Sequence, residues 1–106
     1  MGSLLLAAYN PRGDLDYIGH VGTGTGWNTA LLANLATVLA PLEQPTPPTT
    51  GRAVPRADAR DAHWVRPVTV GEVVYRTWTP DGSLRHPSWR GLRPDKDPQE
   101  VNVDKL

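Results

Sequence analysis

Two strand–turn–strand patterns on either side of a single helix pattern are the feature that most limits how this chain can fold. Residues 3–21 carry strand-forming side chains around the turn Asn10-Pro11-Arg12-Gly13. Residues 68–92 do the same around Thr79-Pro80-Asp81-Gly82. Turns this short join antiparallel strands, whereas parallel strands need a long crossover connection. The two hairpins therefore argue against a parallel sheet and predict an all-β fold with one helix.

The helix is predicted by a stripe of apolar residues after the glycine-rich stretch 22–26. The stripe repeats at every fourth position and consists of Trp27, Leu31, Leu35 and Leu39. This spacing is typical of an amphipathic helix, which we expect from about Thr29 to Ala40. Asn28 would cap its N-terminus, and Pro41 would end it.

The remaining segments are expected to complete a small barrel. Residues 41–61 are rich in proline and would cross the domain in an extended, semi-rigid form. Residues 63–65 form a short strand, and residues 84–92 form the last strand. The order β-β-α-β-β-β predicts a five-stranded Greek-key antiparallel barrel over residues 3–98. The polar tail 99–106 is expected to fray.

Length and composition limit the class of protein. The chain has 106 residues, which fits one domain, and no cysteine, so it can form neither a disulfide nor a thiolate metal site. Residues 4–8 are too short an apolar stretch for a secretion signal, and nothing approaches the ~18 apolar residues of a membrane span. We therefore expect a protein of the reducing cytoplasm with no membrane partner.

The net charge is zero, but the basic residues are concentrated in the second half of the chain. Residues 52–93 contain eight arginines against four acidic residues, whereas Arg12 is the only basic residue before position 52. One interpretation is a positive face that binds phosphate groups. The other is an ordinary solvated surface.

The glycine-rich loop 22–26 lies between a predicted strand and the predicted helix, as nucleotide-binding turns do. It lacks the spacing of the dinucleotide fingerprint and the lysine of the phosphate loop. Its backbone N–H groups can still hold a phosphate oxygen of DNA or of a nucleotide. A tight turn that needs glycines at positive φ is the simpler interpretation.

Other candidate catalytic groups do not form a recognisable set. His20, His63 and His86 are too widely spaced for a metal site, and zinc would need further ligands. Asp14 and Asp16 fall at a hairpin turn, where solvated side chains are common. No metal site is predicted.

The segment 84–98 is the most informative part of the chain. Arg85, Arg93 and Lys96 lie on the last predicted strand and at its exit, and Asp95 can orient them. Arginine binds phosphate oxygens through two parallel N–H bonds, and lysine binds them as a point charge. The group therefore suits a polyphosphate, although a solvated basic edge strand would carry the same residues.

This segment resembles the last signature motif of ATP-dependent DNA ligases, often numbered VI. Arg-His-Pro at 85–87 is followed by Gly-Leu-Arg-x-Asp-Lys at 91–96. The resemblance covers about Ser3 to Val103, with matching segments in the same order at 17–24, 63–67, 71–73 and 77–87. The pattern is most similar to bacterial end-joining ligases of the ligase D or C type.

The resemblance implies an OB-fold domain that adopts two positions in its parent enzyme. In one position Arg85, Arg93, Asp95 and Lys96 would orient the pyrophosphate of ATP while a lysine elsewhere is adenylylated. In the other position the domain would bind nicked duplex DNA without reading its sequence. The DNA contacts implied are Gly22, Thr23, Gly24, Arg66, Arg76 and Arg90.

The chain departs from the family pattern because it lacks the nucleophile motif Lys-x-Asp-Gly; neither Lys96 nor Lys105 has that context. The resemblance therefore implies a nucleotidyltransferase domain elsewhere in the same ligase, which would use ATP and a divalent metal, Mg²⁺ or Mn²⁺. We expect the isolated domain to be an inactive monomer that binds neither ATP nor metal. In the cell it would be cytoplasmic and nucleoid-associated, acting in DNA repair, recombination and end joining.

Two other functions stay open at this point. A free-standing OB-fold binder of single-stranded nucleic acid would stack bases on aromatic side chains over a basic groove. Its candidate platforms are Tyr9, Tyr17, Trp64 and Trp78. A domain of the mRNA-capping type shares the same two-domain plan, although the Gly-Leu-Arg-x-Asp-Lys ending and the Val-Gly-Thr-Gly hairpin favour a ligase.

Overall fold

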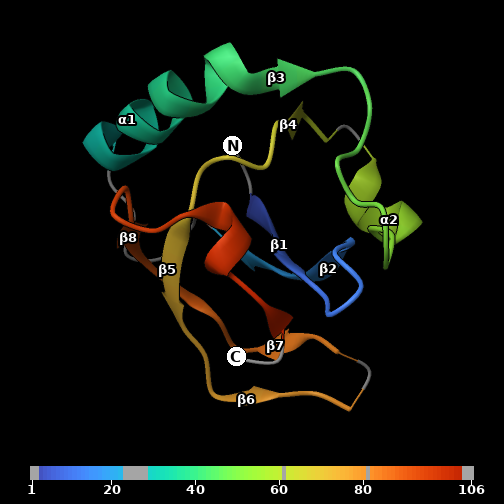
Figure 1. Cartoon of the computed structure of the whole chain (residues 1–106). Helices are drawn as coiled ribbons and strands as arrows, with labels where there is room; N and C mark the ends of the chain where they lie inside the picture. Colours follow the sequence, from blue (N-terminus) through green and yellow to red (C-terminus); the bar gives the residue numbers. More distant parts are fainter. Residues whose placement is uncertain (1–2, 23–28, 61, 81, 104–106) are drawn as a thin grey trace.

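The computed structural model describes residues 3–22, 29–60, 62–80 and 82–103. Within these ranges most elements are strands, and one helix of several turns lies along one side of them (Figure 1). This confirms the predicted mostly-β fold with one helix.

The first predicted hairpin is confirmed. β1 (Ser3–Tyr9) and β2 (Leu15–Gly22) pair in antiparallel orientation. Asn10 stabilises the turn between them, because its Oδ1 accepts hydrogen bonds from the backbone N–H groups of Arg12 and Asp14 at 2.9 and 3.1 Å. Such side-chain bonds to nearby backbone are the reason that asparagine favours turns.

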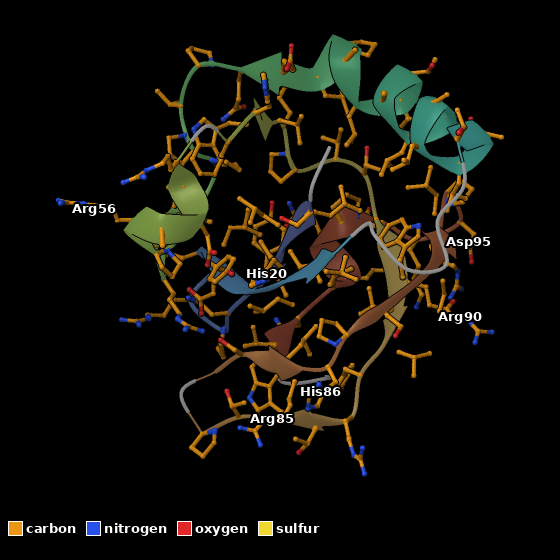
Figure 2. All side chains as sticks on the ribbon, turned by 180° about the vertical axis from the view of Figure 1, so that it is seen from behind. His20, Arg56, Arg85, His86, Arg90 and Asp95 are labelled. Atoms are coloured by element: carbon orange, nitrogen blue, oxygen red, sulfur yellow. The ribbon has the colours of Figure 1, made fainter. Side chains whose placement is uncertain are left out.

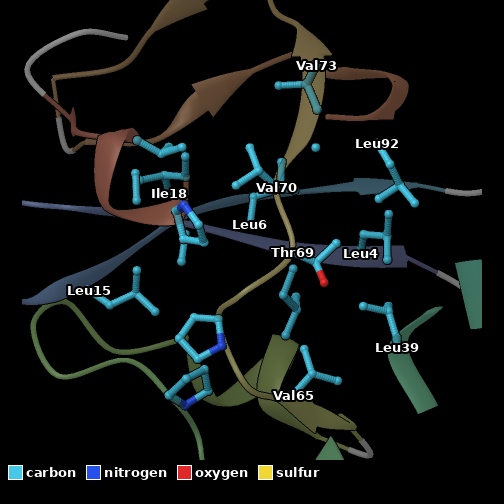
Figure 3. Close-up of a pocket in the computed structure, with 18 of the residues that line it drawn as sticks. Leu4, Leu6, Leu15, Ile18, Leu39, Val65, Thr69, Val70, Val73 and Leu92 are labelled. Carbon is cyan, nitrogen blue, oxygen red and sulfur yellow. The ribbon is translucent and has the colours of Figure 1, made fainter. Parts of the chain in front are cut away.

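The predicted helix is α1 (Thr29–Leu39). Leu35 is buried, and together with Leu39 it lines the same apolar cavity as Leu4 of β1 (Figure 3). The leucine stripe therefore faces the first hairpin, as its four-residue spacing predicts. The expected cap, Asn28, lies outside the described residues.

The proline-rich crossing has more local structure than the sequence predicts. It begins with the 3-10 turn η1 (Ala40–Leu42), whose central proline ends α1 as expected. It continues through the short strand β3 (Glu43–Gln44) and a single turn of helix, α2 (Arg56–Ala59). The Arg52 backbone N–H donates to Asp16 Oδ1 at 2.7 Å, so the crossing is attached to β2.

The second half of the chain contributes the remaining strands. These are β4 (Trp64–Val65), β5 (Gly71–Val74), β6 (Thr77–Trp78), β7 (Leu84–Arg85) and β8 (Ser88–Leu92). The hairpin predicted around residues 79–82 is confirmed as the β6–β7 pair. The single last strand expected over 84–92 is wrong, because His86 divides it. His86 has a φ of 55°, a left-handed conformation that interrupts an extended strand.

The strands form four two-stranded antiparallel sheets, β1–β2, β3–β4, β5–β8 and β6–β7. Across the described residues these sheets do not join into one closed barrel, so the five-stranded Greek-key barrel is not confirmed. Two of the pairs contain an irregularity, since the register shifts between Leu6 and Ala7 in β1–β2 and between Glu72 and Val73 in β5–β8.

The hydrophobic core lies where the first hairpin meets β7. Ala8, Ile18 and Leu84 are 1%, 5% and 8% exposed and pack against one another. Gly19 of β2 lies against the Leu84 backbone and has a φ of 138°, a conformation that residues with a side chain rarely adopt. An apolar cavity of about 240 Å³ remains between the hairpin, α1 and β5 (Figure 3).

The expectation of a frayed tail is wrong for the described residues after 98. The 3-10 turn η2 (Pro98–Glu100) begins with a capping box in which Asp97 accepts from the Gln99 backbone N–H. The Tyr9 backbone N–H then donates to the Val101 carbonyl oxygen at 3.0 Å. Val101 and Val103 pack against the core, so the last described residues belong to the folded domain.

Candidate functional site

The guanidinium of Arg93, directly after β8, is held between two carboxylates. Its Nε and Nη2 donate to Oδ1 and Oδ2 of Asp95 at 3.0 and 2.9 Å, which is a bidentate pair. Its Nη1 donates to Oε1 of Glu72 at 2.7 Å. These bonds use three of the five N–H groups that a guanidinium carries.

The pairing of β5 with β8 brings Glu72 to Arg93. Glu72 lies opposite Gly91 in the antiparallel register. The Arg93 backbone N–H donates to the Val70 carbonyl oxygen at 2.8 Å, which continues the contact between the two chain segments beyond the last paired residue. Residues 21 positions apart in the sequence thus meet at the exit of β8.

The ion pairs shift the pKa values of both partners. Hydrogen bonds from Arg93 are the main cause that lowers the pKa of Asp95 to about 2, and a backbone hydrogen bond and the charge of Lys96 act in the same direction. The bonds to Asp95 and then to Glu72 raise the pKa of Arg93. The Arg93 side chain is 38% exposed, so a charged guanidinium stays accessible from solvent.

The structure brings together three of the four residues predicted to orient pyrophosphate. Asp95 binds Arg93 directly, and the Lys96 backbone N–H donates to the Arg93 carbonyl oxygen at 3.1 Å. Lys96 is exposed. Arg85 is not in this group, because it lies on β7 at a different edge of the molecule from Asp95 (Figure 2). Glu72 joins the group although the sequence did not indicate it.

The predicted DNA contacts are described only in part. Thr23 and Gly24 lie outside the described residues. The other four predicted contacts are described, and all four are exposed: Gly22, Arg66, Arg76 and Arg90. They come from the end of β2, from the residue after β4, from the β5–β6 connection and from β8.

The arginines of the second half do not all share one face. Arg56 on α2, Arg85 on β7 and Arg90 on β8 project from different edges of the molecule in Figure 2. The charge asymmetry of the sequence therefore gives several small basic regions, and the region around Arg90 lies on the same side as Asp95 (Figure 2).

A second cluster of polar side chains joins β2 to α2. The Tyr17 hydroxyl donates to Asp58 Oδ2 at 3.0 Å and lies 3.2 Å from His20 Nδ1, while Arg52 lies over the Tyr17 ring at 5.7 Å from its centroid. Burial, followed by the bond to Asp58, raises the pKa of Tyr17 to about 12. Tyr17 is 4% exposed, so it cannot serve as a base-stacking platform.

The described ranges contain neither a cluster of metal-ligating side chains nor a membrane-spanning helix. No three His, Asp or Glu side chains among the described residues lie together as metal ligands would. In the same part of the chain, no helix is long and apolar enough to cross a membrane.

Residues 1–96 match a family model described as the ATP dependent DNA ligase C terminal region. The mostly-β fold with one helix agrees with this match. The chain therefore belongs to the family of C-terminal regions of ATP-dependent DNA ligases, and the resemblance in its sequence is confirmed.

Within this family the chain is similar to the multifunctional non-homologous end joining proteins LigD. It is 48% identical to LigD of Mycobacterium tuberculosis over 95% of this chain and 13% of that protein. It is 34% identical to LigD of Pseudomonas aeruginosa over 99% of this chain and 12% of that protein. The chain thus spans about an eighth of the length of these relatives.

Two solved structures have the same fold as this chain. The crystal structure of the ligase domain of M. tuberculosis LigD superposes with a TM-score of 0.84 at 48% identity, over 94% of this chain and 32% of that chain. A mycobacterial DNA ligase D complexed with ATP and MES superposes with a TM-score of 0.83 at 47% identity, with the same coverage.

Proposed function

We propose that this chain is the C-terminal domain of an end-joining DNA ligase, and that it orients the pyrophosphate of ATP while a lysine of the catalytic domain is adenylylated. The observation that carries the proposal is the guanidinium of Arg93, fixed by Asp95 at the exit of β8 and followed by Lys96. The similarity to a ligase D complexed with ATP supports it.

The chemistry needs positive charge on the leaving side. The lysine nitrogen attacks the α-phosphorus of ATP, the bond from that phosphorus to the bridging oxygen breaks, and negative charge grows on the departing pyrophosphate. A charged donor that is already oriented stabilises this charge without reorganising during the reaction. Arg93 supplies directed N–H bonds, and Lys96 supplies a mobile point charge.

The N–H groups of Arg93 suit phosphate oxygens as hydrogen-bond donors. The carboxylate oxygens beside them are already bonded to Arg93 and do not suit a metal ion. Both oxygens of Asp95 and the Oε1 of Glu72 accept N–H bonds from Arg93. ATP and a divalent metal, Mg²⁺ or Mn²⁺, would therefore be bound mainly by the nucleotidyltransferase domain of the same ligase. Arg85 can share the pyrophosphate role only if the phosphates extend from the exit of β8 toward β7.

The second proposed role is binding nicked duplex DNA after pyrophosphate has left. Exposed arginines and backbone N–H groups can hold phosphates of the DNA backbone without reading sequence. The residues proposed for this contact are Gly22, Thr23, Gly24, Arg66, Arg76 and Arg90. They come from several elements, which suits a duplex that lies across the domain.

We also infer that the four strand pairs are parts of a five-stranded Greek-key OB barrel. All pairs are antiparallel, β5 pairs with the non-consecutive strand β8, and β2 contacts β7 across the core. In such barrels bulges and bends often interrupt the ladder at the corners.

The experiment is to compare the parent ligase with a form truncated before Ser3. We expect the truncated form to lose formation of the covalent enzyme adenylate from ATP, and the isolated chain to form no adenylate because it lacks Lys-x-Asp-Gly. Radiolabelled ATP and gel electrophoresis would measure both. A truncated ligase that is adenylylated at the full rate would contradict the proposal.

A further inference from the structure

We propose that Glu72 is a positioning residue for lysine adenylylation, which fixes the guanidinium of Arg93 relative to the β5–β8 sheet. The inference rests on the pyrophosphate role proposed above for Arg93. Glu72 is not proposed to contact ATP itself, because its Oε1 accepts a hydrogen bond from Arg93 Nη1 at 2.7 Å.

Asp95 alone cannot fix Arg93 relative to the sheet. It lies two residues after Arg93 and outside β8, so it moves with the same chain segment as Arg93. The bidentate bond sets the plane of the two groups relative to each other, but it adds no contact between the guanidinium and the β5–β8 sheet. Because its side chain is 63% exposed, Asp95 has little packing to restrain it.

Glu72 differs from Asp95 because it lies within a strand. It belongs to β5 and pairs with Gly91 of β8, so its backbone is held by the sheet. Its carboxylate takes the Nη1 side of the guanidinium, while Asp95 takes the Nε and Nη2 edge. Two carboxylates on two sides fix both the position and the plane of the group, and its remaining N–H groups then have a set direction.

The charges show why direction matters at this site. Arg93 and Lys96 carry two positive charges, and Glu72 and Asp95 carry two negative charges, so the formal sum is zero. A neutral group of this kind has little long-range attraction for a polyphosphate. Its effect on pyrophosphate must therefore come from donors that already point to where charge develops.

The test uses the complete ligase with Glu72→Gln and Glu72→Ala. We expect Glu72→Ala to lower kcat for adenylylation about tenfold, which is the lower end of the loss when a residue that orients another functional side chain is removed. Because the lost alignment acts in the transition state, KM for ATP should change little. Glu72→Gln should lie between Glu72→Ala and the wild type, since an amide oxygen still accepts from Nη1. Sealing of a nick that already carries a 5′-adenylate should be unchanged.

Glu43→Gln is the matched control, because it also removes one exposed negative charge, but from β3. It should leave adenylylation unchanged. Thermal unfolding of every variant checks for a purely structural effect, which would slow both half-reactions together and overturn the inference. Faster adenylylation by Glu72→Ala would also overturn it, because Glu72 would then be competing with pyrophosphate for Arg93.

Arg93→Ala separates the two proposals. If Arg93→Ala spares adenylylation, the pyrophosphate role itself fails. If Arg93→Ala impairs adenylylation but Glu72→Ala does not, only the role of Glu72 fails. The double variant should be no slower than Arg93→Ala alone, because Glu72 acts through Arg93. Additive losses would contradict that coupling.

Discussion

At the scale of single residues, the hydrogen bonds of Arg93 determine what the candidate site can bind. A bidentate bond to Asp95 and a single bond to Glu72 leave a charged donor at the surface that is already oriented. The pair with Asp95 could be predicted from the sequence, because two residues at a strand exit are close in any fold. The pair with Glu72 could not, since it depends on the register of β5 and β8.

The Arg93–Asp95 pair predicts an acid titration. The pKa of Asp95 is lowered to about 2, so the favourable contribution of the pair is complete above the usual carboxyl pKa near 4 and is lost as the pH falls through about 2. A carboxyl-carbon NMR titration of the isolated chain should show this midpoint. In Arg93→Ala the midpoint should rise toward the ordinary range. An unchanged midpoint would contradict the pairing.

The raised pKa of Tyr17 predicts that the stability of the domain falls at alkaline pH. Its pKa is raised to about 12, mainly by burial, so its contribution to the free energy of unfolding is complete below pH 10 and falls as the pH rises through 12. Denaturant unfolding of the wild type and Tyr17→Phe at pH 8 and pH 11 would measure it. The stability advantage of the wild type over Tyr17→Phe should shrink at pH 11. An equal advantage at both pH values would contradict the raised pKa of the buried Tyr17 hydroxyl.

The β5–β8 pair is the element that positions the candidate site. Gly71 of β5 lies under the ring of Trp89 of β8, and a Cβ on Gly71 would overlap that ring. Lack of space, and not a positive φ, favours glycine at this position. The contact lets the two strands approach closely, and Glu72 follows directly after it.

Gly71→Ala should therefore destabilise the domain by about 1 kcal/mol, the lower end of the cost of overpacking, because the ring can shift. Urea unfolding measures the loss. Gly22→Ala is the control, since no heavy atom lies within 4 Å of a Cβ there. Trp89→Leu in the Gly71→Ala background should cost less than in the wild type. Equal stability of the two alanine variants would contradict the close contact.

Elements that depend on local signals could be predicted, and elements that depend on distant contacts could not. Asn10 and Gly82 mark turns, and the leucine spacing gives α1 to within one residue at its end. The order of residues 98–103 has one local signal, the capping box of Asp97 and Glu100, but its attachment to the core depends on a backbone bond between Tyr9 and Val101, 92 positions away. The left-handed φ of His86 has no sequence signal of its own, although Pro87, which cannot donate to a strand ladder, indicates a break at this point.

At the scale of the whole molecule, the domain combines zero net charge with basic residues on several edges. It also lacks a Lys-x-Asp-Gly motif. Under the proposed function, the adenylylated lysine belongs to the nucleotidyltransferase domain, and this domain assists its reaction. The chain spans about an eighth of the length of the relatives that it matches.

The charge distribution predicts weak DNA binding by the isolated chain. We expect affinity for duplex DNA without sequence preference, and a steep loss of affinity as salt rises, because each neutralised phosphate releases counterions. Fluorescence anisotropy at several salt concentrations with two unrelated duplexes measures both properties. Arg90→Ala should weaken binding equally for the two duplexes. Tight binding to one duplex that survives high salt would argue against a backbone contact.

The central claim is that this domain acts on pyrophosphate during lysine adenylylation, and Lys96→Ala tests it most directly. In the complete ligase, single-turnover rates are measured separately for adenylylation by ATP and for sealing of a nick that already carries a 5′-adenylate. We predict a loss of about a hundredfold in adenylylation, with sealing close to the wild-type rate because pyrophosphate has already left. If Lys96→Ala slowed both steps equally, the role assigned to this group would be contradicted.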